Sequence, residues 1–160
     1  MEYTFNVKSK SAIVEFKQGL WTTCLVGSES LFQLRNRSQE CRMILINSKL
    51  KTFSVRYLAA HDWERDGACL VNLRDEKIIL IGGSFEIDLV AHRSLTNVAS
   101  YDLAKNAWKN DMPSLNEERA GASACLLGNY IYVFGGKRSL LHENLFGPLI
   151  SEKLNLHNLD

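Results

Sequence analysis

The sequence has no apolar run of about 18 residues, the length that a membrane-spanning helix needs. The start of the chain, MEYTFNVKSK, also lacks the apolar centre of a secretory signal. Both absences favour a cytoplasmic protein. No cluster of lysines and arginines has the density of a phosphate-binding surface, and the formal net charge is only +1. We therefore expect neither a membrane nor a nucleic acid as a partner.

The sequence also lacks the spacings that bind metals or phosphates. Its cysteines form no Cys-x-x-Cys pair and have no histidine at zinc-ligand spacing. Such scattered cysteines are more typical of small buried hydrophobic residues. The glycines of Gly82-Gly83-Ser84 are not followed by the Gly-Lys-Ser/Thr of a phosphate-binding loop. We therefore expect no metal ion and no cofactor. The four cysteines are Cys24, Cys41, Cys69 and Cys125.

The composition that remains is ordinary for a globular chain. Of its 160 residues, 46% are hydrophobic and 23% are charged. This length favours a single domain with a real hydrophobic core.

The sequence repeats itself at intervals of 53 to 55 residues. The segment Glu64-Arg65-Asp66-Gly67-Ala68 recurs, 54 residues later, as Glu118-Arg119-Ala120-Gly121-Ala122. The doublet Gly82-Gly83 recurs as Gly135-Gly136 after 53 residues. A degraded copy of the doublet, Gly27-Ser28, lies 55 residues upstream. A fixed period of this kind predicts a repeated structural unit, and we divide the chain into residues 5–57, 58–112 and an incomplete third unit, 113–160.

Each unit is expected to consist of short β-strands. The middle unit has four segments that are rich in β-branched, aromatic or apolar residues and are bounded by Gly, Asn, Asp or Pro. They are Cys69–Leu73, Lys77–Ile81, Val98–Leu103 and Ala107–Lys109. Four strands in about 50 residues are typical of one β-propeller blade. Because propellers usually have 4 to 8 blades, three units predict an all-β, incomplete propeller.

The motif residues resemble those of the kelch repeat family. After the doublet come Tyr101, six further residues, Trp108, Pro113 and an Arg-x-Gly that begins the next unit. The window 119–136, RAGASACLLGNYIYVFGG, resembles the strand-turn-strand segment of that family in spacing and residue type. The resemblance extends well over residues 41–160 and weakly over 5–40. It implies kelch-type β-propeller blades, each a four-stranded antiparallel sheet, and a function in binding other proteins.

Six residues of the motif are expected to be structural. Glycine permits a positive φ and a close approach of neighbouring blades, which the turn after the second strand requires. Trp and Tyr can bury a large area across a blade boundary. The six residues are Gly82, Gly83, Tyr101, Trp108, Gly135 and Gly136.

Arg65 and Arg119 are the candidate protein-binding residues, because each occupies the same place in its unit. By the resemblance, this place lies where loops meet a shallow central pocket. Two guanidinium groups on one rim could bind the carboxylates of an acidic partner segment. The alternative is that each arginine is tied to its own loop, by Glu64 or by Glu118.

The favoured function is a non-catalytic protein-interaction module. We expect it to bind partners through interblade loops and through the long loops 84–97 and 137–149. Exposed blade edges would also favour self-association, since their backbone groups lack internal partners.

Two alternatives stay open. One is a propeller-type enzyme such as a sugar-acid mutarotase or an oxidase, which would need acid and base groups held together in a pocket. The other is a non-functional fragment of a longer kelch protein. The acid-base candidates are His61, Asp62, His92, Glu117, Glu118 and His142.

Overall fold

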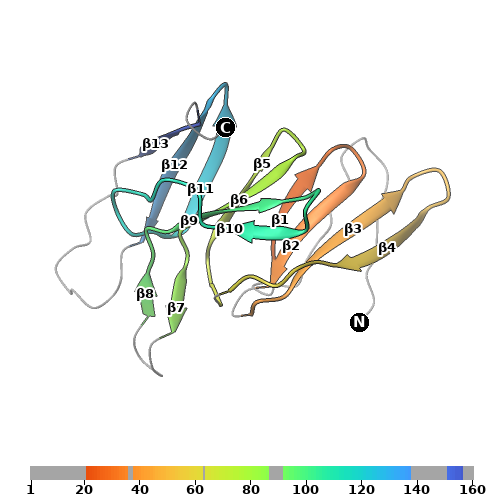
Figure 1. Cartoon of the computed structure of the whole chain (residues 1–160), viewed down its shortest axis with the longest axis horizontal. Coiled ribbons are helices and arrows are strands. Elements are labelled where there is room, and N and C mark those ends of the chain that lie inside the picture. Colours follow the sequence, from red (N-terminus) through yellow and green to blue (C-terminus); the bar gives the residue numbers. More distant parts are fainter. Residues whose placement is uncertain (1–20, 36–37, 63, 87–91, 138–150, 157–160) are drawn as a thin grey trace.

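The computed structural model describes residues 21–35, 38–62, 64–86, 92–137 and 151–156. Within these ranges all regular structure is β, in thirteen strands, and no helix occurs. The strands form three antiparallel sheets and one small hairpin (Figure 1).

The first two sheets each have four strands. The first sheet has the order β1 (Trp21–Val26), β2 (Ser30–Arg35), β3 (Cys41–Asn47) and β4 (Thr52–Tyr57). The second has the order β5 (Cys69–Leu73), β6 (Lys77–Ile81), β9 (Val98–Asp102) and β10 (Ala107–Lys109). The four strands predicted for the middle unit are therefore confirmed, with the third ending at Asp102.

The third sheet consists of β11 (Ala120–Leu127), β12 (Tyr130–Lys137) and β13 (Glu152–Asn155). A separate hairpin of β7 (Ser84–Glu86) and β8 (His92–Ser94) is inserted between β6 and β9. The segment 84–97, which we predicted as a loop, thus contains two short strands. Most of the predicted loop 137–149 lies outside the described residues.

The three sheets are arranged like neighbouring blades of a propeller (Figure 1). Their first strands lie together, because β5 contacts both β1 and β11. From these inner strands each sheet extends outward in chain order. The described residues are thus all-β and form blades of an incomplete, kelch-like propeller.

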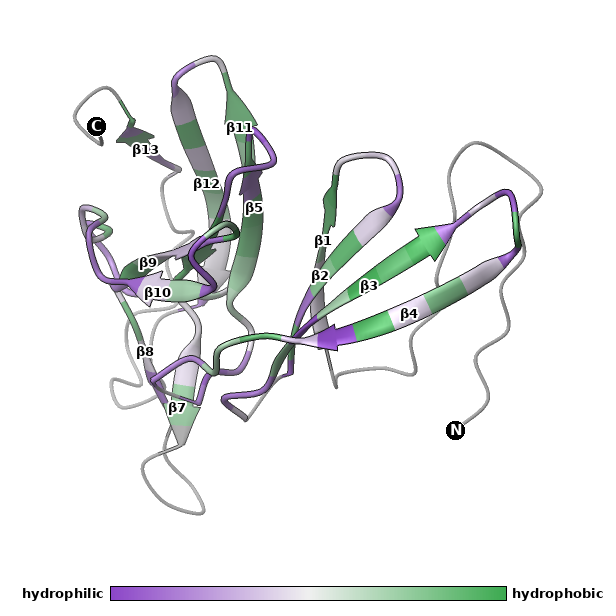
Figure 2. Ribbon diagram, turned by 45° about the vertical axis from the view of Figure 1, so that its right-hand side comes forward, coloured by the Kyte–Doolittle hydropathy of each residue, from purple (hydrophilic) through white to green (hydrophobic). Residues whose placement is uncertain are grey.

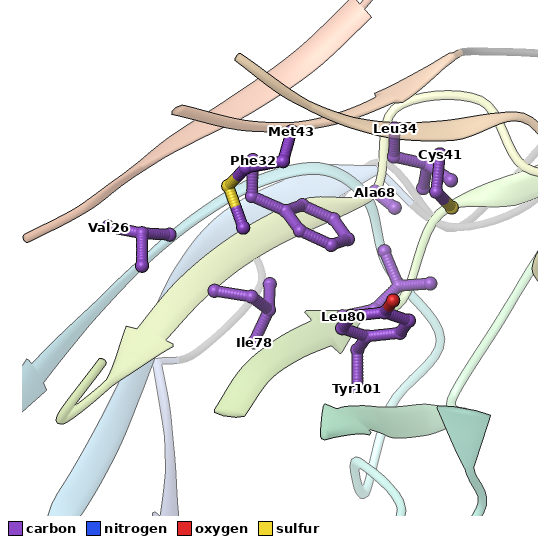
Figure 3. Packing of buried hydrophobic residues seen from close by; sticks show 9 residues of the cluster. All are labelled: Val26, Phe32, Leu34, Cys41, Met43, Ala68, Ile78, Leu80 and Tyr101. Atoms are coloured by element: carbon purple, nitrogen blue, oxygen red, sulfur yellow. The ribbon is translucent and has the colours of Figure 1, made fainter. Parts of the chain in front are cut away.

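The middle blade is buried on both faces. Ile78 and Leu80 of β6 pack in one apolar cluster with residues of the first sheet, whereas Ile79 and Ile81 pack in another with residues of the third sheet. Figure 3 shows Phe32 of the first sheet directed toward Ile78 and Leu80. Burial on both faces explains why this strand is a continuous apolar run without polar alternation.

Two aromatic residues of the second blade also contact the first blade. Tyr101 is fully buried, and its ring centroid lies 5.3 Å from that of Phe32. Trp108 packs edge-on against Phe32, and its Nε1 donates a hydrogen bond to the Ala59 carbonyl at 3.1 Å. The outer strands of the second blade are therefore joined to the chain that leaves the first.

Main-chain hydrogen bonds connect the second and third blades. The Gly83 amide donates to the Arg119 carbonyl, and the Gly121 amide donates to the Gly67 carbonyl, each at 2.7 Å. Gly82 has a φ of +60°, and a Cβ there would lie 2.4 Å from the Arg119 oxygen. Glycine is needed at Gly82 both for this backbone conformation and for the close approach.

The third blade has one face that packs on the second blade and one that does not. Ile131 and Val133 of β12 are buried in the cluster shared with the second blade. The alternate residues Tyr130, Tyr132 and Phe134 lie on the opposite face. The rings of Tyr132 and Phe134 are stacked, with their centroids 6.4 Å apart. Figure 2 shows apolar residues along much of β11 and β12. We call these three aromatic residues the third-blade outer face.

Candidate functional site

A groove of about 640 Å³ lies beside the β7–β8 hairpin. Its lining comes from four separate parts of the chain: the turn before β3, the segment before β5, the hairpin with the residues that follow it, and the segment before β11. Figure 1 shows the hairpin projecting from the second blade, away from the other strands. The lining residues are Gln39, Asp62, Glu64, Phe85, Arg93, Ser94, Leu95, Thr96 and Glu118.

Backbone pairing fixes the base of the hairpin to two blades. Asp66 and Ser84 exchange two main-chain hydrogen bonds of 2.8 Å, which tie β7 to the start of the second blade. On the other side, the Leu95 amide donates to the Gly83 carbonyl, and the Arg119 amide donates to the Leu95 carbonyl. The groove is therefore held by rigid main-chain contacts, although its lining residues are far apart in sequence.

Arg65 follows the groove residue Glu64 in the chain, but its side chain points into the protein. Its side chain is 1% exposed, and Nη1 donates to the Gly82 carbonyl at 2.8 Å. Nη2 donates to the side-chain oxygen of Asn97. Burial lowers the pKa of this guanidinium to about 10, which leaves it charged near neutral pH. Arg65 thus binds the turn after β6.

Arg119 has the equivalent position in the third blade. It is also 1% exposed, and Nη1 donates to the Gly135 carbonyl at 2.8 Å. Nε and Nη2 both contact Oε1 of Glu152 at 2.9 Å. The Glu152 carboxylate also accepts the backbone amides of Asn116 and Glu117. This buried, hydrogen-bonded ion pair joins β13 to the segment that precedes β11.

The two predicted partner-binding arginines therefore face the interior and not a solvent-exposed rim. Each arginine donates to the glycine turn of its own blade. This agrees with the alternative interpretation, in which each arginine is tied to a loop of its own unit. The contacts, however, are to Gly82, Asn97, Gly135 and Glu152, and not to Glu64 or Glu118. Direct binding of a partner by these residues stays a prediction, and their burial argues against it.

The groove itself carries mixed charge with an acidic excess. Asp62, Glu64 and Glu118 supply three carboxylates, and Arg93 supplies one guanidinium, so the lining has two net negative charges. Phe85 adds an aromatic ring that is 38% exposed. Phe85 and Arg93 are directly paired across the hairpin, so their side chains share one face of it.

Of the acid-base candidates that the structure describes, Asp62 and Glu118 both line the groove, whereas His61 and Glu117 do not. His61 is 2% exposed, with its ring packed edge-on against Trp108 at 4.6 Å, whereas Asp62 lines the groove. Glu117 does not line the groove, and its Oε2 lies 3.7 Å from Nη2 of Arg119. The structure does not describe the side chain of His92 or any part of His142.

The described ranges hold neither a cluster of metal-ligating side chains nor a helix that could cross a membrane. Nowhere in these ranges do three His, Cys, Asp or Glu side chains come together in a way that could hold a metal ion. The same part of the chain contains no helix of the length and hydrophobicity needed to cross a membrane.

Sequence reasoning missed Phe85 and Arg93 as site residues. Both fall in a segment that we treated as one long loop, and neither belongs to the repeat. No clear sequence signal marks these two strands, because each has only three residues, fewer than the runs of about 4 to 8 from which strands are predicted.

Comparison with known proteins supports the fold. No family model and no curated protein matches this sequence. Among solved structures, the chain is similar to one titled "Structure of YjhT", with a TM-score of 0.64 and 18% sequence identity. The match covers 75% of this chain and 34% of the YjhT chain, so this chain spans about a third of that propeller.

Proposed function

We propose that this chain belongs to the kelch-repeat proteins and acts as a non-catalytic module that binds other proteins. The repeat of Arg-x-Gly, glycine doublet, Tyr and Trp supports the family, together with the four-stranded blades. The observation that carries the function is the groove beside the hairpin, which combines an exposed aromatic ring with charged side chains.

The groove has the chemistry of a protein-binding surface. Aromatic residues and arginine are enriched at the centres of protein interfaces, and polar residues surround them. Here Phe85 and Arg93 are adjacent on the hairpin, and Gln39, Thr96 and the carboxylates surround them. Loops on a rigid β scaffold are a frequent place for such surfaces.

A non-catalytic role is supported by the arrangement of the histidine and the carboxylates. An acid-base pair must lie within hydrogen-bond reach of one substrate atom. His61 packs against Trp108 in the interior, whereas Asp62, Glu64 and Glu118 line the groove. The described imidazole of His61 is therefore separated from the groove carboxylates, which are available to bind charged groups of a partner.

The proposal can be tested by selecting random dodecapeptides, displayed on phage, against the purified full chain. We expect peptides to be enriched by the unchanged protein and lost with Phe85→Ala, because this change removes the exposed ring from the groove. Phe53→Ala is a matched control, since it removes another exposed ring, outside the groove lining. Circular dichroism would verify that both variants fold.

Two results would contradict the proposal. One is a selection in which no peptide is enriched by the unchanged protein. The other is enrichment that Phe85→Ala leaves intact, which would place binding outside the groove.

A further inference from the structure

We infer that the groove binds a protein segment in which a lysine or arginine lies next to an apolar side chain. This inference rests on the proposed function and specifies its partner. It differs from the sequence-based expectation of an acidic partner, because the arginines that suggested an acidic segment are buried and do not line the groove.

The charge of the lining selects a cation. Asp62 and Glu64 precede β5, and Glu118 precedes β11, so carboxylates come from the starts of two different blades. A cationic side chain between them would be attracted by both. An acidic segment would instead meet three carboxylates and could gain from Arg93 alone among the lining residues.

The buried arginines do not cancel this excess at the groove surface. Arg119 is paired with Glu152 at 2.9 Å and lies 3.7 Å from Glu117. Arg65 directs its Nη atoms toward the Gly82 carbonyl and Asn97, away from the lining. Arg119 is therefore balanced by a carboxylate, whereas Arg65 bonds to neutral acceptors and keeps its positive charge; with Arg65 counted, the three lining carboxylates against Arg93 and Arg65 still leave one net negative charge.

The hairpin supplies the apolar half of the site. Phe85 is 38% exposed, and Leu95 is half-buried in the same lining. An apolar side chain on the partner would cover the ring, and the neighbouring cation could also contact its face. At about 640 Å³, the groove has the size of an ordinary ligand pocket, enough for a few side chains and not for a folded domain.

The test uses two phage-displayed dodecapeptide libraries. In the cationic library a central Lys or Arg is flanked by Leu, Ile, Phe or Met, and in the acidic library Asp or Glu takes the central position. We expect the full chain to enrich the cationic library alone. Affinities of the enriched peptides, labelled with fluorescein, would then be measured by anisotropy and should fall as NaCl rises from about 50 to 300 mM.

Charge variants provide the second arm. Glu64→Lys should weaken binding of the enriched peptides about tenfold, with a smaller loss for Glu64→Gln. Glu76→Lys is the matched control, because Glu76 is exposed in the turn after β5 and does not line the groove. It changes the net charge equally and should leave the affinity unchanged. If Glu64→Lys fails to fold, Glu64→Gln is compared instead with Glu76→Gln, which changes the net charge equally.

The outcomes separate this inference from the proposed function. Enrichment of acidic peptides that depends on Phe85 would overturn the inference and support the proposed function. Cationic peptides that bind Glu64→Lys and Glu76→Lys equally would also overturn the inference, because attraction to the groove carboxylates would play no part. Absence of any enrichment that depends on Phe85, from these or random libraries, would contradict both.

Discussion

At the scale of single residues, Trp108 contributes most visibly to the boundary between the first two blades. Its ring contacts Phe32 and Tyr101, and its indole nitrogen donates to the Ala59 carbonyl. Trp108→Ala removes these contacts and leaves a cavity. We expect the free energy of unfolding to fall by about 3 to 5 kcal/mol, measured by urea denaturation.

The neighbouring Lys109→Ala serves as the control, because Lys109 is exposed on the same strand. An unchanged midpoint for Trp108→Ala would show that this ring does not stabilise the blade boundary.

Three thiols, of which Cys41 is buried and Cys24 and Cys69 are half-buried, predict a loss of stability in alkali. Burial raises the pKa of Cys24 and Cys41 to about 12 and that of Cys69 to about 11. The ordinary thiol value of 9.0 applies to the unfolded chain, so the folded protein holds these protons more tightly. Their contribution is complete below about pH 9 and is lost as the pH rises toward 11 to 12.

We therefore expect the unfolding free energy to decrease between pH 9 and 11, measured by urea titration at each pH. A variant with all three cysteines changed to alanine should show a weaker decrease over the same interval. Equal slopes for the two proteins would mean that other groups cause the alkaline loss.

At the scale of elements, the glycine turn after the second strand offers a matched pair of positions. Gly82 and Gly135 have φ values of +60° and +64°. A Cβ at Gly82 would meet the Arg119 carbonyl, whereas a Cβ at Gly135 has no described atom within 4 Å. Gly135→Ala should therefore cost only the left-handed backbone strain, about 1 to 2 kcal/mol.

Gly82→Ala should cost that strain and the displacement of a neighbouring strand, together about 2 to 5 kcal/mol. Thermal denaturation of the two single variants compares them directly. Equal losses would indicate that the close approach of the second and third blades does not limit Gly82.

The sequence was sufficient to predict the strands of the middle blade, because the period and the turn residues both mark their ends. It was not sufficient to predict where Arg65 and Arg119 point. An arginine that precedes a strand has the same residue type and the same position in the repeat whether its side chain faces solvent or bonds to a buried carbonyl. The main partner of Arg119, Glu152, lies 33 residues downstream in a unit without a clear motif. The groove was missed for a similar reason, since its lining brings together residues from Gln39 to Glu118.

At the scale of the whole molecule, the third-blade outer face predicts association between chains. Phe134 is 46% exposed, and Leu127 at the end of β11 is 68% exposed. In the second blade, the corresponding apolar face is covered by the third. We expect this surface to pack against another sheet, so that the purified chain forms dimers or larger assemblies at micromolar concentration.

Size-exclusion chromatography with light scattering would measure this association. Tyr132→Lys together with Phe134→Lys should shift the protein toward the monomer, since charged residues on this face oppose apolar packing. Phe85→Lys, on the hairpin, is the control and should not. A monomer for the unchanged protein at every concentration would contradict the prediction.

The main-chain bonds between the second and third blades also bear on how freely the sequence can vary. The Gly83 amide with the Arg119 carbonyl, and the Gly121 amide with the Gly67 carbonyl, use groups that almost every amino acid possesses. Proline cannot occupy the donor positions, because it has no amide hydrogen, and a β-carbon cannot be placed where the backbones approach closely. Apart from these two restrictions, the hydrogen bonds do not depend on the type of side chain. Such a tolerant junction helps to explain how chains that share 18% of their residues can have the same blade geometry. Diversity can then accumulate in the loops and hairpins while the blades keep their spacing.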